Sequence, residues 1–278
     1  MKSSKRRCHG HLVVLAVLVF VAWVMVGRAD VSSAGLVGWW AFNETSGVVA
    51  YDTSGSGNNG IISGLAYFTD DPEMGQVLEI AGASGQVEIP HSPVLEPETG
   101  TIVLWIKPSE KQYADLVYKK TNRLIQRDTP YTLYVYMMRL YANGAIEAAI
   151  ANDDPDIKWL QLGSWTPAQL VTVGEWNQVA MRWDNRAWAV FVNGRLVLVQ
   201  PYTPTPSSGL SYSGTFPLMV GAHFFDPSVY NGYFDYRGRM ADLRLYSRPL
   251  SEDEIAALYA DKKQDFAHGQ GVKGPKNY

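Results

Sequence analysis

Three glycines between Asp52 and Gly60 have the spacing of a phosphate-binding loop. Gly55, Gly57 and Gly60 satisfy G-x-G-x-x-G, which indicates dinucleotide binding only where the loop opens a helix whose N-terminus can face a pyrophosphate. The residues that follow, 61–65, are too few and too closely bounded by glycine for a helix. We therefore predict an Asx-rich turn between two strands, in which Asp and Asn side chains bind nearby backbone and glycines adopt positive φ.

Motifs of common hydrolases are absent from the chain, which contains neither G-x-S-x-G nor H-E-x-x-H. His91, His223 and His268 lie in no recognisable metal or nucleophile motif, so we interpret them as structural or exposed. The acidic run 252–254 is interpreted as a helix N-terminus, where acids offset the helix dipole. We therefore predict no catalytic residues and no enzymatic activity.

The N-terminus has the pattern of a secretory signal. Four basic residues precede an apolar run over 12–26, and Gly27-Arg28-Ala29 supplies small residues for a signal peptidase. We predict a signal peptide over residues 1–29 and a secreted, periplasmic or cell-surface protein without a membrane span after cleavage. An uncleaved anchor is the alternative, although the run is shorter than the about 20 residues of a spanning helix.

The charge balance of the remaining chain excludes some partners. Removal of residues 1–29 takes away five basic residues, so 19 remain against 27 acidic residues, a net charge of −8. This balance disfavours nucleic acid as a partner. The single cysteine, Cys8, leaves with the signal, so stability must come from core burial without a disulfide.

From Leu36 onward, short apolar runs with a period of two or with little interruption predict strands. The ranges are 37–41, 77–80, 86–89, 101–106, 131–137, 145–150, 177–183, 187–192 and 239–246. Asn143-Gly144 and Asn193-Gly194 are dipeptides that type I′ hairpins prefer, and Asp184-Asn185 is expected to join another pair. Many short strands with such turns predict an all-β, two-sheet antiparallel sandwich.

One helix is predicted, near the C-terminus. Ser251 is a good N-cap, Glu254 completes a capping box, and Ile255, Leu258 and Tyr259 give an apolar stripe. We expect this helix to pack on one end of the sandwich. One domain is predicted over residues 30–261, and the Gly- and Lys-rich segment 262–278 is predicted to be disordered.

Four stretches in order resemble the laminin G-like jelly-roll domains of the concanavalin A-like lectin/glucanase superfamily. They cover roughly residues 36–260. The stretches are 38–44 with the loop 52–60, 85–90 with 101–108, 175–180 with 190–194, and 238–251. The resemblance implies a concanavalin A-like jelly roll with one short C-terminal helix. It also brings to mind laminarinase-type glucanases, but their E-x-D-x-x-E signature is absent.

The resemblance also implies a structural calcium between the opening and closing strands. Asp52, Asn58 and Asp242 are the candidate ligands, because hard cations prefer carboxylate and amide oxygens. Ala241 replaces an acidic residue of the family pattern, which weakens the set. In the alternative interpretation, Asp52 and Asn58 only stabilise a turn and Asp242 is a solvated strand residue.

The segment 223–236 has the composition of a sugar-binding rim. Sugars stack their apolar faces on aromatic rings, while carboxylates and amides order their hydroxyls. The predicted ligand-binding residues are Phe225, Asp226, Tyr230, Asn231, Tyr233, Phe234 and Asp235. The alternative is that aromatic residues fill the core, as we expect of Trp39, Trp105 and Trp183.

These observations predict a non-catalytic binding module whose partner is a glycan or another extracellular surface component. Two alternatives remain open. The sandwich could be a structural or adhesive spacer without a glycan site, or a glycan-active hydrolase with an atypical site.

Overall fold

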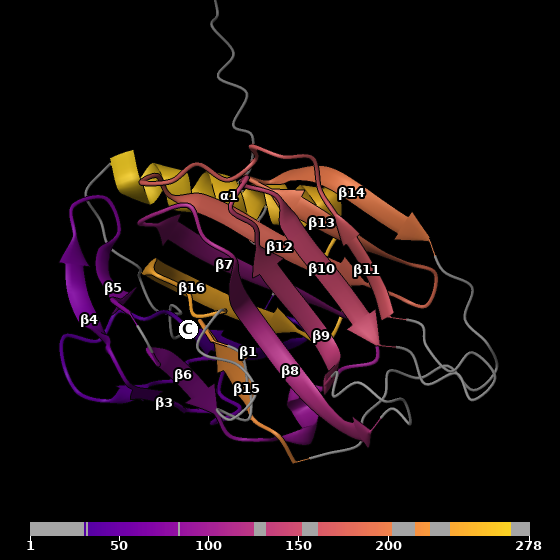
Figure 1. Ribbon diagram of the computed structural model, residues 1–278, viewed down its shortest axis with the longest axis horizontal. Coiled ribbons are helices and arrows are strands. Elements are labelled where there is room, and N and C mark those ends of the chain that lie inside the picture. The colour runs from indigo at the N-terminus through magenta and orange to yellow at the C-terminus, as the bar shows by residue number, and fades with distance from the viewer. Residues whose placement is uncertain are drawn as a thin grey trace, which may run out of the picture.

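Two antiparallel sheets and a C-terminal helix make up the computed structural model, which describes residues 31, 33–82, 84–124, 132–151, 161–201, 215–222 and 234–267 (Figure 1). We call them the β7 sheet and the β8 sheet after a central strand of each. The β7 sheet has the order β14-β13-β12-β7-β16-β5-β4, with β1 paired to β16, and the β8 sheet has the order β11-β10-β9-β8-β15-β6-β3-β2. All strand pairs are antiparallel.

The strand bounds are as follows. The β7 sheet contains β1 (Leu36–Trp40), β4 (Ala66–Asp71), β5 (Gly75–Ile80), β7 (Gly100–Pro108), β12 (Asn177–Trp183), β13 (Ala187–Val192), β14 (Arg195–Pro201) and β16 (Gly238–Tyr246). The β8 sheet contains β2 (Val49–Ala50), β3 (Gly60–Ser63), β6 (Gln86–Ile89), β8 (Ala114–Leu124), β9 (Thr132–Leu140), β10 (Ile146–Ala151), β11 (Gln161–Trp165) and β15 (Leu218–Val220). A 3-10 turn, η1, spans Pro93–Leu95.

Alternating side chains of both sheets fill the space between them. Ile102, Leu104 and Ile106 of β7 belong to the same buried cluster as Ile146 and Ile150 of β10. Because successive strand residues point to opposite faces, this cluster fixes which face of each sheet is inside. The jelly-roll sandwich predicted from the sequence is confirmed.

Two predicted hairpin turns differ in outcome. Asn193 and Gly194 have φ of 52° and 74° and join β13 to β14, as a type I′ turn requires. Asn143 has no positive φ, and Gly144 N–H donates to the Tyr141 carbonyl at 2.8 Å, so the central residues are Ala142 and Asn143. The type I′ prediction at Asn143-Gly144 was therefore wrong.

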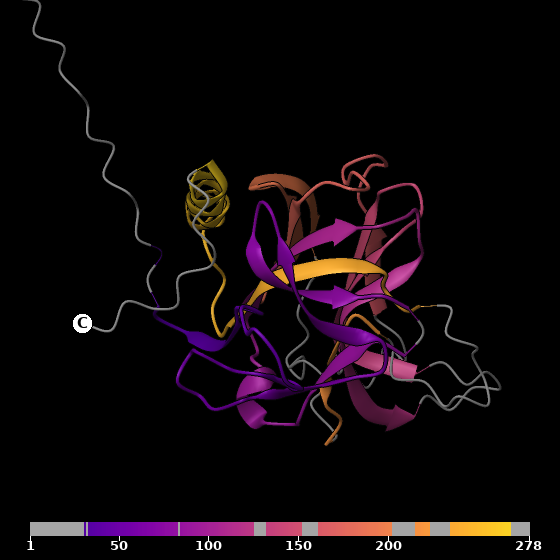
Figure 2. The same cartoon turned by 90° about the vertical axis from the view of Figure 1, so that its left-hand side faces the viewer.

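Helix α1 (Glu252–Ala267) packs along the outer face of the β7 sheet rather than on one end of the sandwich. Ile255 and Leu258 are buried with Val103 and Phe191, and Tyr259 stacks on Trp105 at 5.5 Å between centroids. Figure 2 shows the helix on the side of the β7 sheet that faces away from the β8 sheet. The sequence predicted that Trp105 fills the core of the sandwich. In the structure Trp105 is instead buried under the helix, on the outer face of the β7 sheet.

The end of α1 corrects the predicted tail. The helix continues to Ala267, so residues 262–267 are helical and not disordered, and Lys262 is buried. Residues 268–278 and the predicted signal over 1–29 lie outside the described residues. Within the described ranges, no helix is long and apolar enough to cross a membrane.

We expect Ser251→Ala to lower the free energy of unfolding by about 1 kcal/mol. The Ser251 hydroxyl accepts the Glu254 N–H at 3.1 Å, and the Glu254 carboxylate accepts the Ser251 N–H at 2.8 Å, which confirms the capping box. Urea unfolding measures the effect. Ser46→Ala, at an exposed loop position, is the matched control, and an equal loss in both variants would contradict the assignment.

Candidate functional site

Most of the predicted sugar-binding rim falls outside the part of the chain that the structure describes. Phe225, Asp226, Tyr230, Asn231 and Tyr233 lie there, and only Phe234 and Asp235 are described. The Phe234 carbonyl accepts the Asp115 N–H at 2.9 Å, and the Asp235 carboxylate accepts the Ser84 N–H at 2.9 Å. These bonds tie the end of the predicted rim to β8 and to the turn before β6.

Phe234 joins a group of side chains on the outer face of the β8 sheet, which we call the Arg139 cluster. Its members are Tyr113, Asp115, Arg139, Tyr141, Glu147 and Phe234. The Arg139 guanidinium carbon lies 4.4 Å from the Phe234 ring centroid and 5.1 Å from that of Tyr113. The Tyr113 and Tyr141 rings meet edge to face at 4.6 Å. Two partly exposed rings therefore lie against one cation, and a third, Tyr141, packs on Tyr113.

Ion pairs and hydrogen bonds hold the rings in place. Asp115, Arg139 and Glu147 face one another across β8, β9 and β10 in the strand register. Arg139 binds both carboxylate oxygens of Asp115 and donates to the Tyr113 hydroxyl at 3.0 Å. The Tyr141 hydroxyl donates to Glu147 Oε2 at 2.9 Å. Both phenols are thus held in fixed orientations by a buried ionic row.

Burial and ion pairing shift the pKa values of the charged side chains in this row. Burial raises the pKa of Glu147, while Arg139 and Tyr141 act in the opposite direction. Burial lowers the pKa of Arg139, but Asp115 outweighs this effect and raises it. Arg139 lies 3.5 Å from Glu147 as well as in contact with Asp115, so one guanidinium engages both acids. The arrangement offers stacking surfaces and hydrogen-bonding groups held in fixed positions.

A hollow of ≈ 480 Å³ opens beside Tyr141. Three segments line it, namely 108–112 between β7 and β8, 140–144 at the β9–β10 turn, and 168–173 between β11 and β12. We call it the Tyr141 hollow. Since Tyr141 belongs to both, the Arg139 cluster and the hollow form one continuous surface.

The walls of the Tyr141 hollow are hydrogen-bonded to one another. The Gln169 N–H donates to the Asn143 carbonyl at 2.8 Å, and the Val171 N–H donates to the Gly144 carbonyl at 3.0 Å. Gly144 has φ of 78°, and a Cβ there would lie 2.6 Å from the Val171 carbonyl oxygen, so only glycine fits. The β9–β10 turn and the 168–173 segment are therefore held together by backbone hydrogen bonds.

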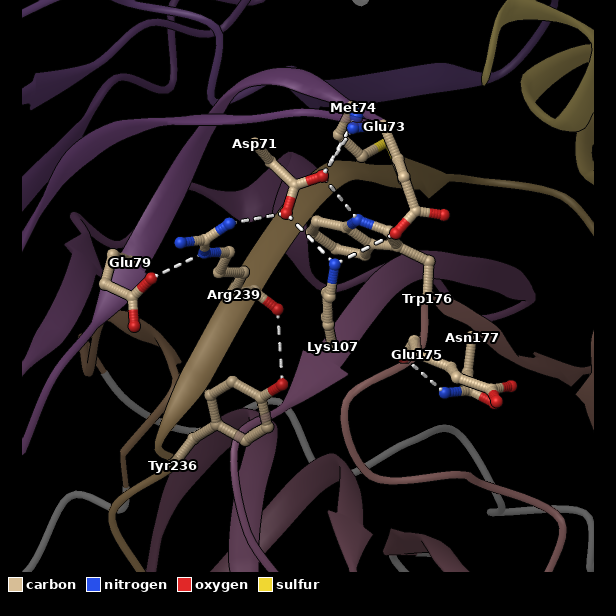
Figure 3. A network of polar contacts seen from close by, with 10 residues as sticks. All are labelled: Asp71, Glu73, Met74, Glu79, Lys107, Glu175, Trp176, Asn177, Tyr236 and Arg239. Carbon is tan, nitrogen blue, oxygen red and sulfur yellow. Dashed lines mark hydrogen bonds and ion pairs between the residues drawn. The ribbon is translucent and has the colours of Figure 1, made fainter. Parts of the chain in front are cut away.

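Figure 3 shows a buried carboxylate, Asp71, at the centre of a network of polar contacts on the β7 sheet. The Asp71 side chain is 0% exposed and accepts five donors from four parts of the β7 sheet. They are Trp176 Nε1 at 3.0 Å, Lys107 Nζ at 3.3 Å, Arg239 at 2.6 Å, and the N–H groups of Glu73 and Met74 at 2.9 and 3.1 Å. Burial raises the pKa of Asp71, but the donors outweigh it and lower the pKa to about 2.

The Asp71 network lies close in sequence to residues that bond the walls of the hollow. Lys107 precedes Pro108, a wall residue, and the Gly174 N–H donates to the Pro108 carbonyl at 2.8 Å, two residues before Trp176. Two residues before Arg239, Arg237 exchanges backbone bonds of 2.7 Å with the Gln112 amide. The network is therefore joined to two wall segments through neighbouring residues.

The predicted metal residues at the opening loop form an Asx turn. Asp52 Oδ1 accepts the N–H groups of Trp39 and Ser54, both at 2.9 Å, and Oδ2 accepts the Asn58 N–H at 2.9 Å. Gly55 and Gly57 have positive φ. Asn58 donates to the Val37 carbonyl at 3.1 Å. The turn predicted from the sequence is confirmed.

The third predicted metal ligand, Asp242, is 4% exposed and is not a solvated strand residue. Its Oδ1 accepts Trp39 Nε1 at 2.7 Å and Arg244 Nε at 2.9 Å, and its Oδ2 accepts Arg244 at 3.0 Å. Asp242 has φ of 52°, in a β-bulge between Ala241 and Arg244. The Arg244 guanidinium carbon lies 4.4 Å above the Trp39 ring.

The carboxylate oxygens of Asp52 and Asp242 are occupied by N–H donors in this structure. A calcium site needs six to eight oxygens directed at one point, whereas the Asp52 and Asp242 oxygens are directed at N–H groups. Among the described residues, no three His, Cys, Asp or Glu side chains gather where they could hold a metal. Trp39 itself links the two carboxylates, through its backbone N–H and its indole.

Comparison with known proteins agrees with this architecture. A family model of the concanavalin A-like lectin/glucanases superfamily matches residues 81–256, more than half of the chain. The chain belongs to this superfamily. No protein among curated sequences matches this member of the superfamily.

Solved structures share the fold at low identity. A Trypanosoma rangeli sialidase in complex with sialic acid matches with a TM-score of 0.61 and 17% identity, over 87% of this chain and 35% of that chain. The binding domain of Paraclostridial Mosquitocidal Protein 1 matches with 0.61 and 13%, over 82% and 52%. Domain 4 of an extracellular arabinanase from Geobacillus stearothermophilus, in complex with arabinotriose, matches with 0.56 and 16%, over 82% and 100%. This chain therefore spans about a third of the sialidase and half of the toxin chain.

We expect the melting temperature to be the same in calcium and in chelator. A ligand that binds only the native state at 100 times its dissociation constant would add about 2.7 kcal/mol of stability. Here Arg244 and N–H donors already compensate the charge of Asp242. Differential scanning calorimetry with millimolar calcium or EDTA is the test, and a calcium-dependent rise would restore the predicted site at Asp52, Asn58 and Asp242.

Asp71→Asn should reduce the free energy of unfolding at pH 7 by about 2 kcal/mol. Because the folded pKa is about 2 and the ordinary value is 3.8, the contribution of the carboxylate is present above pH 3.8 and lost as the pH falls toward 2. The gap between parent and variant in urea unfolding should therefore close over that interval. Asp70→Asn, at an exposed neighbour, is the control, and a gap that persists at pH 2 would refute the charge-based explanation.

Proposed function

We propose that this chain is a secreted, non-catalytic module that binds a glycan on the Arg139 cluster. The observation that carries the proposal is the set of three partly exposed rings, Tyr113, Tyr141 and Phe234, fixed around a buried ionic row. Rings that are held in place lose little entropy when a sugar stacks on them. The phenol hydroxyls of the partly exposed Tyr113 and Tyr141 supply groups that can order sugar hydroxyls.

Several considerations support this function over its alternatives. The arabinanase domain was solved with arabinotriose and the toxin domain is a binding domain, and both have this fold, although at these identities the likeness concerns the fold alone. A retaining glycosidase needs one carboxyl as nucleophile and another as acid. In the cluster, both acids, Asp115 and Glu147, are engaged by Arg139, and the chain lacks the glucanase motif. Both observations favour binding over hydrolysis.

Export is part of the proposal and rests on the sequence pattern of residues 1–29. Domains that bind extracellular glycans must reach the outside of the cell, so the predicted signal and the proposed ligand agree. Tyr230 and Tyr233 remain predicted glycan contacts. They precede Phe234 in the sequence, and Phe234 belongs to the Arg139 cluster.

A glycan array combined with a reducing-sugar assay separates the three functions. Binding without product release supports the module, and product release identifies an atypical hydrolase. Self-association in sedimentation velocity with neither signal identifies a structural or adhesive protein, and it would refute the proposal.

We expect Phe234→Ala and Tyr113→Ala each to weaken glycan binding by about two- to tenfold, because a stacked ring contributes roughly 0.5–1.5 kcal/mol. Both rings are partly exposed, so the melting temperature should fall by only a few degrees. Tyr67→Ala, at a 51% exposed tyrosine of β4 in the other sheet, is the matched control. Isothermal titration with an array-identified glycan is the measurement. Unchanged affinity in both variants would exclude the Arg139 cluster as the site.

A further inference from the structure

The Tyr141 hollow continues the surface of the Arg139 cluster at one edge. The Tyr141 ring lines the hollow, while its hydroxyl donates to Glu147 of the cluster. We propose that the hollow binds the terminal part of a neutral, hydroxyl-rich glycan whose adjoining part stacks on the cluster. This inference rests on the proposed function and specifies the class of glycan.

The lining favours a ligand without charge. Asn143, Gln169 and Thr172 are exposed uncharged polar side chains at the hollow. Amides and hydroxyls of this kind both donate to and accept from sugar hydroxyls. Glu110 and Lys111 are the charged residues of the lining, and their charges are opposite. Recognition of a carboxylate, sulfate or phosphate would require an excess of cationic donors, which this lining does not provide.

The adjoining cluster points to the same class of ligand. Asp115 and Glu147 are two acids against one guanidinium, and Asp115 takes two donors of Arg139. Since both acids engage the buried Arg139 guanidinium, the cluster offers no open cation to an anionic sugar. A neutral sugar meets only hydrogen-bonding groups and rings.

The hollow is also formed before a ligand arrives. Its walls are bonded to one another through the Gln169 and Val171 N–H groups, and Asp71 bonds Lys107 and Trp176, which lie close in sequence to the 108–112 and 168–173 segments. Gln169 has φ of 65°, a conformation that a non-glycine residue adopts only when its surroundings impose it. A preformed wall reduces the entropy lost on binding. The volume of ≈ 480 Å³ lies within the range of small-molecule pockets.

Two variants test the hollow separately from the cluster. Thr172→Trp places a large ring at an exposed lining position and should obstruct the hollow. Gln169→Gly removes a lining amide while it accepts the positive φ without strain. Thr45→Trp, in the exposed loop between β1 and β2, is the matched control. We expect at least a tenfold loss of affinity for neutral oligosaccharides in Thr172→Trp and several-fold in Gln169→Gly. Melting temperatures should stay near that of the parent, and Thr45→Trp should bind as the parent does.

The probes are a neutral panel of arabinose, glucose, galactose and mannose oligosaccharides and an acidic panel of sialylated and uronate oligosaccharides. Preference of the parent for the neutral panel supports the inference, and preference for the acidic panel overturns it. If Phe234→Ala weakens binding but both hollow variants bind as the parent, the hollow is excluded and the proposed function stands. If the parent binds neither panel, the proposed function fails and this inference fails with it.

Discussion

The Asp71 carboxylate is the interaction on which the geometry of the site depends. One buried negative charge receives donors from the β4–β5 turn, from β7, from β16 and from the segment before β12. Two of those donors, Lys107 and Arg239, are cations that also pair with Glu73 and Glu79, so the Asp71 carboxylate links two further ion pairs into one network. Lys107 directly precedes the lining residue Pro108, and Arg237, two residues before Arg239, bonds the lining residue Gln112, so this network lies close in sequence to the wall of the hollow.

A second set of contacts, which we call the Trp39 joint, connects the first strand of the domain, β1, to its last strand, β16. Trp39 gives its N–H to Asp52 and its indole to Asp242, and Arg244 covers its ring. The resemblance to calcium-holding relatives implied an ion at this joint. A guanidinium compensates the same carboxylate from within the chain, and its planar donors fit both oxygens at once. The positive φ of Asp242 is explained by this contact, since the bulge turns the carboxylate toward Trp39 and Arg244.

The sequence predicted the strands in which apolar residues alternate strongly. It missed strands in which some of the buried side chains are charged. Strand β8 carries Asp115 and Lys119, both buried, because ion pairs and not apolar contacts satisfy them. The turn at Asn143-Gly144 followed the bonds that the 168–173 segment makes to it rather than its local preference. Local patterns also missed the last helical turns of α1, where Lys262 lies near Asp242.

The sequence could indicate the proposed site only in part, for the same physical reason. Composition marks a local segment, and it led to Phe234, but the Arg139 cluster joins residues from 113 to 234 that only the strand register brings together. The register itself follows from a hairpin turn near Asn143, which places Arg139 opposite Glu147. The two outer faces of the sandwich therefore differ in kind. Helix α1 packs on the face of the β7 sheet, where Trp105 is buried beneath Tyr259. On the β8 sheet, partly exposed rings held by hydrogen bonds lie at the edge of the Tyr141 hollow, and this is the face on which we propose that a glycan stacks.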